Sequence, residues 1–182
     1  MTGPQVTRKE GKAMKPYLIV IDMQNDFIDG ALGTPEAQAM LPRAVERIRG
    51  FRDGAVIATM DTHEADYLDT AEGQKLPVVH CVRGTAGWQI APAVKEALGT
   101  DCVIVEKPTF GSVRLPGLIE DPESIELIGL CTDICVVSNA LLLKAHFPEV
   151  PIRVDSSCCA GVTPEKHRAA LETMASCQIE IL

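Results

Sequence analysis

The sequence predicts an α/β protein with a three-layer α/β/α fold and a doubly wound, mainly parallel sheet. Short runs of branched apolar residues alternate with segments of helical periodicity along the chain, and this alternation is typical of parallel strands joined by helices. With 182 residues, of which 46% are hydrophobic, the chain can form one such domain. It is too short for two domains that each bury a sufficient hydrophobic core.

Each predicted strand is a short apolar run that suits burial on both faces of a sheet. The run that ends at Gly129 is interpreted as the central strand, and Cys158-Cys159 as small residues in a tight turn after a later strand, with a redox pair as the alternative. The predicted strands cover residues 17–21, 55–60, 101–106, 125–129, 150–154 and 179–182.

Four helices are predicted between these strands. Residues 41–52 place apolar side chains at helical spacing, and 135–143 are apolar without a helix breaker. A short helix is expected at 92–98. A further helix at 164–176 begins with Thr163-Pro164, and proline is favoured at the first helical position.

Residues 1–15 are polar and aperiodic, so we expect a flexible tail before a single domain at 16–182, with Met14 as an alternative start to Met1. There is no apolar signal-peptide core and no apolar run that could cross a bilayer. A net charge of −8 without a basic cluster disfavours nucleic-acid and membrane partners. Seven irregularly spaced cysteines indicate reduced thiols in the cytoplasm.

Three chemically different side chains follow predicted strands: Asp22, Lys107 and Cys135. The carboxyl ends of parallel strands share one edge, where open α/β sheets bind ligands. Together these groups could attack an amide: the thiol adds to the carbonyl carbon, the carboxylate relays the proton and the lysine stabilises the thiolate. Each residue also has a simpler interpretation, as a turn or cap residue, a solvated lysine and an inert buried cysteine.

A sharp turn at 131–135 joins the central strand to the helix after it. Either Thr132 or Asp133 could cap this helix. A thiol at a helix N-terminus has a lowered pKa, so we expect Cys135 to be reactive. Backbone N–H groups at the same place could bind an oxyanion.

A second group follows the strand at 55–60. Asp61 and His63 alternate along an extended segment, and a long irregular segment after them contains Glu72 and His80. Long loops in compact domains are usually functional, and a mixed set of histidine and carboxylate suits Zn²⁺, Fe²⁺ or Mn²⁺. On its own, the Asp-x-His pattern is weak, because loop histidines are more often surface groups.

In these motifs the chain resembles the isochorismatase-like cysteine hydrolases and, among them, the nicotinamidases, over residues 17–182. The motifs occur in the order typical of the family. They are IDMQNDF at 21–27, DTH at 61–63, LPVVHC at 76–81, EKPTFGS at 106–112 and GLCTDIC at 129–135.

The resemblance implies that Asp22, Lys107 and Cys135 form a catalytic triad. It also implies a cis peptide bond between Leu130 and Cys131, and an oxyanion hole formed by the N–H groups of Cys131 and Cys135.

The resemblance further implies a divalent metal beside the triad, with zinc expected and iron or manganese as alternatives, which takes the pyridine nitrogen of nicotinamide. Asp61, His63 and His80 match ligand positions, and we expect Glu72 as the remaining ligand, with Asp69 as the alternative. Isochorismatases proper lack this metal site, so these residues favour the nicotinamidase branch.

The implied activity is hydrolysis of nicotinamide to nicotinate and ammonia, a reaction of NAD salvage, through a cysteine thioester. Phe27 resembles the aromatic residue that lines the ring pocket, and Trp88 is a further candidate there. The alternatives are hydrolysis of another small amide, such as an N-carbamoyl or ureido compound, or a catalytically silent binding protein. The resemblance also implies a homo-oligomer.

Overall fold

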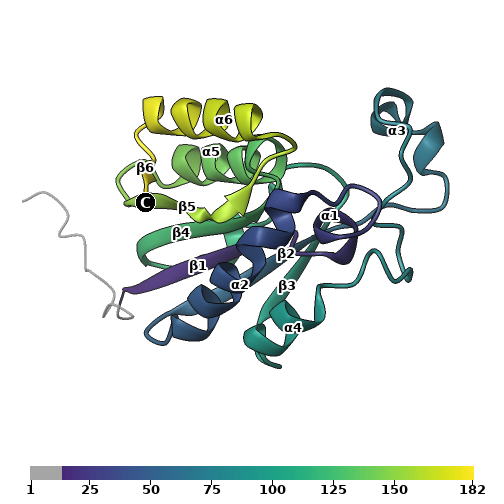
Figure 1. Ribbon diagram of the computed structural model, residues 1–182. Helices are drawn as coiled ribbons and strands as arrows, with labels where there is room; N and C mark the ends of the chain where they lie inside the picture. Colours follow the sequence, from purple (N-terminus) through teal and green to yellow (C-terminus); the bar gives the residue numbers. More distant parts are fainter. Residues whose placement is uncertain (1–13) are drawn as a thin grey trace, which may run out of the picture.

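The computed structural model describes residues 14–182, so the predicted flexible tail lies almost entirely outside the described residues. A parallel sheet is covered by helices on both faces (Figure 1), as the sequence predicts. Its strands are β1 (Lys15–Ile21), β2 (Ala55–Asp61), β3 (Val103–Lys107), β4 (Pro122–Leu130), β5 (Ile152–Ala160) and β6 (Glu180–Ile181). They lie side by side in the order β3-β2-β1-β4-β5-β6.

The helices are divided between the two faces of the sheet. In Figure 1, α2 and α4 lie on one face, and α5 and α6 lie on the other. The helices are α1 (Asn25–Ile28), α2 (Pro35–Gly50), α3 (Ala71–Lys75), α4 (Pro92–Leu98), α5 (Val137–His146) and α6 (Pro164–Ser176). Shorter turns are η1 (Tyr67–Asp69), η2 (Pro116–Leu118) and the π-helical η3 (Thr132–Val136).

Strand β1 is apolar because both of its faces are buried. Alternate residues along a strand point to opposite faces: Leu18 belongs to the core beneath α2, and Ile19 to the core that also contains Ala140 of α5. Both Leu18 and Ile19 are fully buried. This position between β2 and β4 places the end of β1 at the middle of the sheet edge.

Gly129 allows the ends of β1 and β4 to approach each other closely. A Cβ at this position would lie 2.1 Å from the Ile21 carbonyl oxygen, and the φ of Gly129 is 121°, a conformation that favours glycine. The closeness of these two strand ends brings the residues that follow them together.

Several element boundaries differ from the prediction. Helix α2 begins at Pro35 rather than Leu41, because the Thr34 hydroxyl accepts a hydrogen bond from the Ala37 N–H (3.0 Å) and caps it there. Helices α4 and α6 have the predicted bounds.

Strand β5 is longer than predicted. Its pairing with β4 passes from Leu127↔Val154 to Gly129↔Cys159, so a bulge accommodates the extra residues. The interpretation of Cys158-Cys159 as a turn is therefore wrong, since both lie buried in the strand. Over residues 14–182, the structure contains no helix that is both long and apolar enough to cross a bilayer.

Candidate active site and metal centre

The three residues of the predicted triad meet at the carboxyl edge of the sheet. Asp22 directly follows β1, Lys107 is the last residue of β3, and Cys135 lies in η3 after β4. Their exposed fractions are 0% for Asp22, 1% for Lys107 and 3% for Cys135. A buried ammonium and a buried carboxylate are rarely found unless they are paired.

Lys107 contacts both of the other groups. Its Nζ lies 2.6 Å from Asp22 Oδ2 and 3.5 Å from Cys135 Sγ, and it also donates a hydrogen bond to the Thr109 carbonyl at 3.1 Å. The acid, the cation and the sulfur therefore lie within mutual reach in one buried cluster.

Asp22 is held in an uncommon backbone conformation. Its φ is 46°, which aspartate tolerates better than most residues, and such conformations concentrate at functional sites. The Thr59 hydroxyl on the neighbouring strand β2 donates a hydrogen bond to Asp22 Oδ1 at 2.6 Å. Sequence reasoning missed Thr59, since a threonine within an apolar strand looks like an ordinary strand residue.

Burial dominates the proton affinities in this cluster. Burial raises the pKa of Asp22, although the Lys107 ammonium and the Thr59 hydrogen bond act in the opposite direction. Burial, with a further contribution from the Asp22 charge, also raises the pKa of the Cys135 thiol well above its ordinary value, while Lys107 lowers it. The expected lowering of the Cys135 pKa is therefore wrong. A protonated thiol requires a base, and the raised pKa of Asp22 makes its carboxylate a better proton acceptor.

The turn that carries Cys135 has no side-chain cap, in contrast to the prediction. The peptide bond between Leu130 and Cys131 is cis, as the family resemblance implies. Cys131 occupies the N-cap position of η3, and its carbonyl accepts hydrogen bonds from the N–H groups of residues 134 and 136, both at 3.1 Å. The prediction that Thr132 or Asp133 caps this helix is wrong, because both side chains bond to residues at 162–167 instead.

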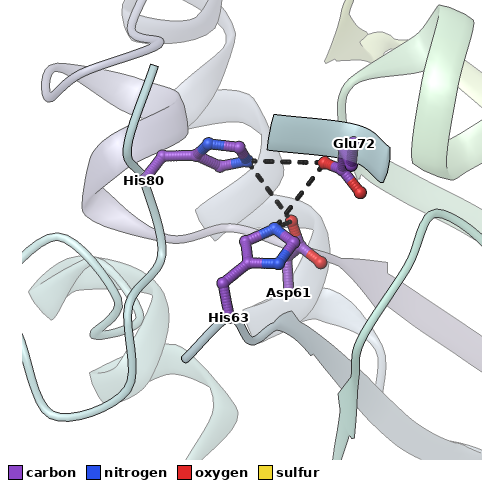
Figure 2. Close-up of side chains that lie close together, drawn as sticks. All are labelled: Asp61, His63, Glu72 and His80. Carbon is purple, nitrogen blue, oxygen red and sulfur yellow. Dashed lines mark hydrogen bonds and ion pairs between the residues drawn. The ribbon is translucent and has the colours of Figure 1, made fainter. Parts of the chain in front are cut away.

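The predicted metal ligands also converge. One ligand atom from each of Asp61, His63, Glu72 and His80 lies within 4.8 Å of the others, and Figure 2 shows the four side chains pointing toward one another. Asp61 Oδ2 lies 3.1 Å from His63 Nε2 and 3.6 Å from His80 Nε2. Glu72 Oε1 lies 3.6 and 3.9 Å from the same two nitrogens.

These separations fit a tetrahedral divalent metal. Ligand atoms about 2.1 Å from zinc are about 3.4 Å apart in a tetrahedron. The group combines two imidazoles with two carboxylates, a donor set suited to zinc, iron or manganese. Asp69, the alternative ligand, is an exposed residue of η1 and lies outside the group.

Neighbouring residues orient the four candidate ligands Asp61, His63, Glu72 and His80, which we call the metal group. His80 Nδ1 lies 2.8 Å from the Val78 carbonyl, a contact that leaves Nε2 facing the other ligands, as is common for metal-binding histidines. The side chain of Gln24 bonds both backbone groups of Asp61, at 2.7 Å to the N–H and 2.8 Å to the carbonyl. The Tyr67 ring packs against His63 and His80, with centroid distances of 4.6 and 5.0 Å. Sequence reasoning did not find these roles of Gln24 and Tyr67.

The charges within the metal group affect the pKa of Asp61 and that of Glu72 in opposite directions. Burial opposes ionisation of Asp61, but hydrogen bonds from His63 and His80 outweigh it and lower the Asp61 pKa. Burial and the charge of Asp61 raise the pKa of Glu72. Lys107 Nζ lies 3.4 Å from Asp61 Oδ1 and so connects the metal group to the triad cluster.

Phe27 and Trp88 make different contacts near this centre. The buried Phe27 ring meets His80 edge-on, with centroids 5.6 Å apart. Trp88 is half-buried, and its indole N–H donates a hydrogen bond to the Thr62 hydroxyl at 2.9 Å.

Comparisons with known proteins agree with this geometry. The sequence model of the isochorismatase domain family matches residues 16–182 of this chain. The nicotinamidase/pyrazinamidase of Mycobacterium tuberculosis is 26% identical over 91% of this chain and 97% of that protein. A structure of Pyrococcus horikoshii pyrazinamidase in complex with zinc is 28% identical with a TM-score of 0.80, covering 92% of this chain and 98% of that one.

A structure of the Bacillus subtilis nicotinamidase/pyrazinamidase PncA is 27% identical with a TM-score of 0.79, covering 92% of this chain and 99% of that one. The matched domain includes every residue of the triad cluster and of the metal group. The chain therefore belongs to the isochorismatase family, and nicotinamidases are among its relatives.

Proposed function

We propose that this protein hydrolyses nicotinamide to nicotinate and ammonia through a thioester on Cys135. The observation that carries the proposal is the position of Lys107 Nζ, 2.6 Å from the Asp22 carboxylate and 3.5 Å from the Cys135 sulfur. The adjacent metal group and the relatives named nicotinamidases support the choice of substrate.

In the first half-reaction, the carboxylate of Asp22 accepts the thiol proton as Cys135 Sγ bonds to the amide carbon. The carbonyl oxygen becomes an oxyanion, for which the N–H groups of Cys131 and Cys135 are the proposed donors. Asp22 then gives its proton to the leaving nitrogen. The C–N bond breaks, ammonia departs, and a thioester remains on Cys135.

In the second half-reaction, Asp22 accepts a proton from water while the water oxygen bonds to the thioester carbon. The C–S bond breaks, the product acid is released, and the sulfur regains its proton from Asp22. Lys107 remains cationic throughout, so that it stabilises the sulfur when it is negative and keeps Asp22 in place.

Asp61, His63, Glu72 and His80 are the residues that would hold a divalent metal, for which we propose zinc. When bound, such an ion supplies a Lewis acid that can take the ring nitrogen of nicotinamide. Phe27, which contacts His80 edge-on, would pack against the bound ring, while Tyr67 and Gln24 keep the ligands oriented.

We also propose that the protein acts in NAD salvage, as a homo-oligomer in the cytoplasm. All seven cysteines, each within the described residues, are free thiols, which fits a reducing compartment. Light scattering coupled to gel filtration measures the oligomeric state, and a mass equal to one chain would contradict that part of the proposal.

The direct test is ammonia release from nicotinamide by the zinc-loaded protein. We expect turnover that Cys135→Ala reduces at least about 10³-fold, since the nucleophile is lost. Cys177→Ala is the matched control, because Cys177 is exposed and lies at the end of α6, and it should keep full activity. Turnover that survives in Cys135→Ala, or turnover confined to N-carbamoyl or ureido substrates, would contradict the proposal.

A further inference from the structure

The turn that carries Cys135 makes hydrogen bonds to the segment at the start of α6. Thr132 is fully buried, and its Oγ1 lies 2.8 Å from Nδ1 of His167 on α6. One residue later, Asp133 Oδ1 accepts a hydrogen bond from the Val162 N–H at 2.9 Å. The two polar side chains at the beginning of η3 therefore both bond to one segment, residues 162–167, that precedes and begins α6.

This segment packs directly against the turn. A Cβ at Gly161 would lie 2.8 Å from Asp133 Oδ1 and 2.9 Å from the Cβ of His167, distances too short for an ordinary contact. Gly161 thus allows the backbone after β5 to lie between the turn and His167. In such close packing, a shift of His167 is transmitted to Thr132.

Thr132 is part of one bonded unit with the proposed catalytic backbone. It follows Cys131, whose carbonyl accepts bonds from residues 134 and 136 on both sides of Cys135. A change in the position of Thr132 therefore moves the peptide groups of Cys131 and Cys135 together. Asp22 follows β1 and Lys107 ends β3, so neither belongs to the turn that His167 contacts through Thr132.

We propose that His167 is a positioning residue of the active site, which acts through Thr132 to hold the turn of Cys131 and Cys135 in place. It contacts the turn rather than the substrate, so it is not a catalytic residue. This role rests on the proposed amide hydrolysis. It predicts a loss of kcat with little change in KM, because the metal group and Phe27, which would bind the ring, come from other elements.

The test is a double-mutant cycle on the zinc-loaded protein. Thr132→Val removes the hydroxyl at constant shape, and His167→Ala removes the ring. We expect each to lower kcat roughly 3- to 10-fold, the effect of one lost hydrogen bond, with KM unchanged. The double variant should be no worse than either single variant, since both remove the same interaction.

Conservative variants keep the test independent of folding defects. Thr132→Ser retains the hydroxyl, and His167→Asn places an amide near the position of Nδ1, so both should recover most of kcat. His146→Ala is the matched control, because His146 is an exposed histidine at the end of α5. Additive losses in the double variant, or full kcat in both Thr132→Val and His167→Ala, would overturn the proposal.

A second measurement needs no substrate. The rate of Cys135 alkylation by iodoacetamide, followed on its own peptide by mass spectrometry, reports the position of the sulfur relative to Lys107, whose charge lowers the thiol pKa. We expect this rate to fall in Thr132→Val and His167→Ala and to be unchanged in His146→Ala. The wild-type protein could fail to hydrolyse nicotinamide while the alkylation rate still falls in Thr132→Val and His167→Ala. That result would contradict the proposed function and support the positioning role of His167. Unchanged alkylation in both variants would remove that role.

Discussion

Lys107 Nζ lies 2.6 Å from Asp22 Oδ2, and both side chains are almost completely buried. A buried ion pair contributes little stability compared with apolar residues, yet removal of one partner leaves an isolated charge in an apolar interior. The desolvation penalty of such a pair is tolerated where the two charges have a function.

Lys107→Met should destabilise the protein strongly. The variant leaves the Asp22 carboxylate buried without its cation, which costs about 3–5 kcal/mol. Urea denaturation measures the free energy of unfolding. Lys95→Met, at an exposed position of α4, is the matched control and should change it by less than about 0.5 kcal/mol.

The double variant Asp22→Asn/Lys107→Met should recover much of this stability, because neither charge then remains buried alone. It should nevertheless lack amidase activity, since both the base and the cation are gone. Equal destabilisation in the single Lys107→Met variant and in the double variant would show that the ion pair is not the cause.

Thr59→Val should move the acidic limb of the pH–activity profile to higher pH. The Thr59 hydrogen bond lowers the pKa of Asp22 against the effect of burial, so its loss raises that pKa further. Because the proposed mechanism requires the Asp22 carboxylate, we expect activity to be lost at a higher pH as the solution is acidified. The measurement is kcat/KM against pH, with zinc content checked at each point.

Thr59→Ser keeps the hydroxyl and is the matched control, with a profile expected to coincide with that of the wild-type protein. An acidic limb that stays in place or moves to lower pH in Thr59→Val would mean that Asp22 is not the group that titrates.

Glu72→Ala should weaken zinc binding at least about 10-fold, since even changes outside the ligand shell weaken metal affinity by that factor or more. Asp69→Ala is a close control, because Asp69 is a nearby carboxylate that is exposed on η1. Competition with a chromophoric chelator measures both dissociation constants. If Asp69→Ala weakened zinc binding more than Glu72→Ala did, the fourth ligand would be Asp69.

Asp26→Ala should weaken the metal group indirectly. Asp26 Oδ2 accepts a hydrogen bond at 2.7 Å from the N–H of Cys81, which follows His80 and has a φ of 44°. Without this acceptor the N–H is left unpaired, at a cost of about 1–3 kcal/mol in unfolding free energy, and His80 is less well held.

For Asp26→Ala we therefore expect both a lower midpoint of urea denaturation and weaker zinc binding. Asp29→Ala tests the specificity of this effect, because Asp29 is an exposed residue just after α1. If the two variants bound zinc equally well, Asp26 would have no part in orienting His80.

Most of the fold, and the convergence of the candidate site residues, could be predicted from sequence. The alternation of apolar runs and helical segments indicates a parallel sheet. Asp22, Lys107 and Cys135 lie at or just after the ends of β1, β3 and β4, which are close in that sheet. The resemblance to a family added the metal group, which the isolated Asp-x-His pattern around Asp61 could not establish.

What could not be predicted depends on contacts between distant segments. Thr59 faces Asp22 only because β1 and β2 are neighbours, and Thr132 bonds His167 instead of capping its own helix. The shift of the Cys135 pKa was predicted with the wrong sign, because the helix N-terminus is visible in sequence whereas the degree of burial is not. The bulge in β5 likewise follows from its pairing with β4.

The position of β1 between β2 and β4 has a consequence for biosynthesis. Residues 15–21 pair with residues 122–129, so the ribosome must add all the residues between these segments before β1 finds its second neighbour. Until then the apolar strand β1 of the nascent chain lacks one of its partners, and exposed strand edges of this kind favour aggregation. Production of this protein should therefore benefit from slow translation, low temperature or chaperones more than its modest size would suggest.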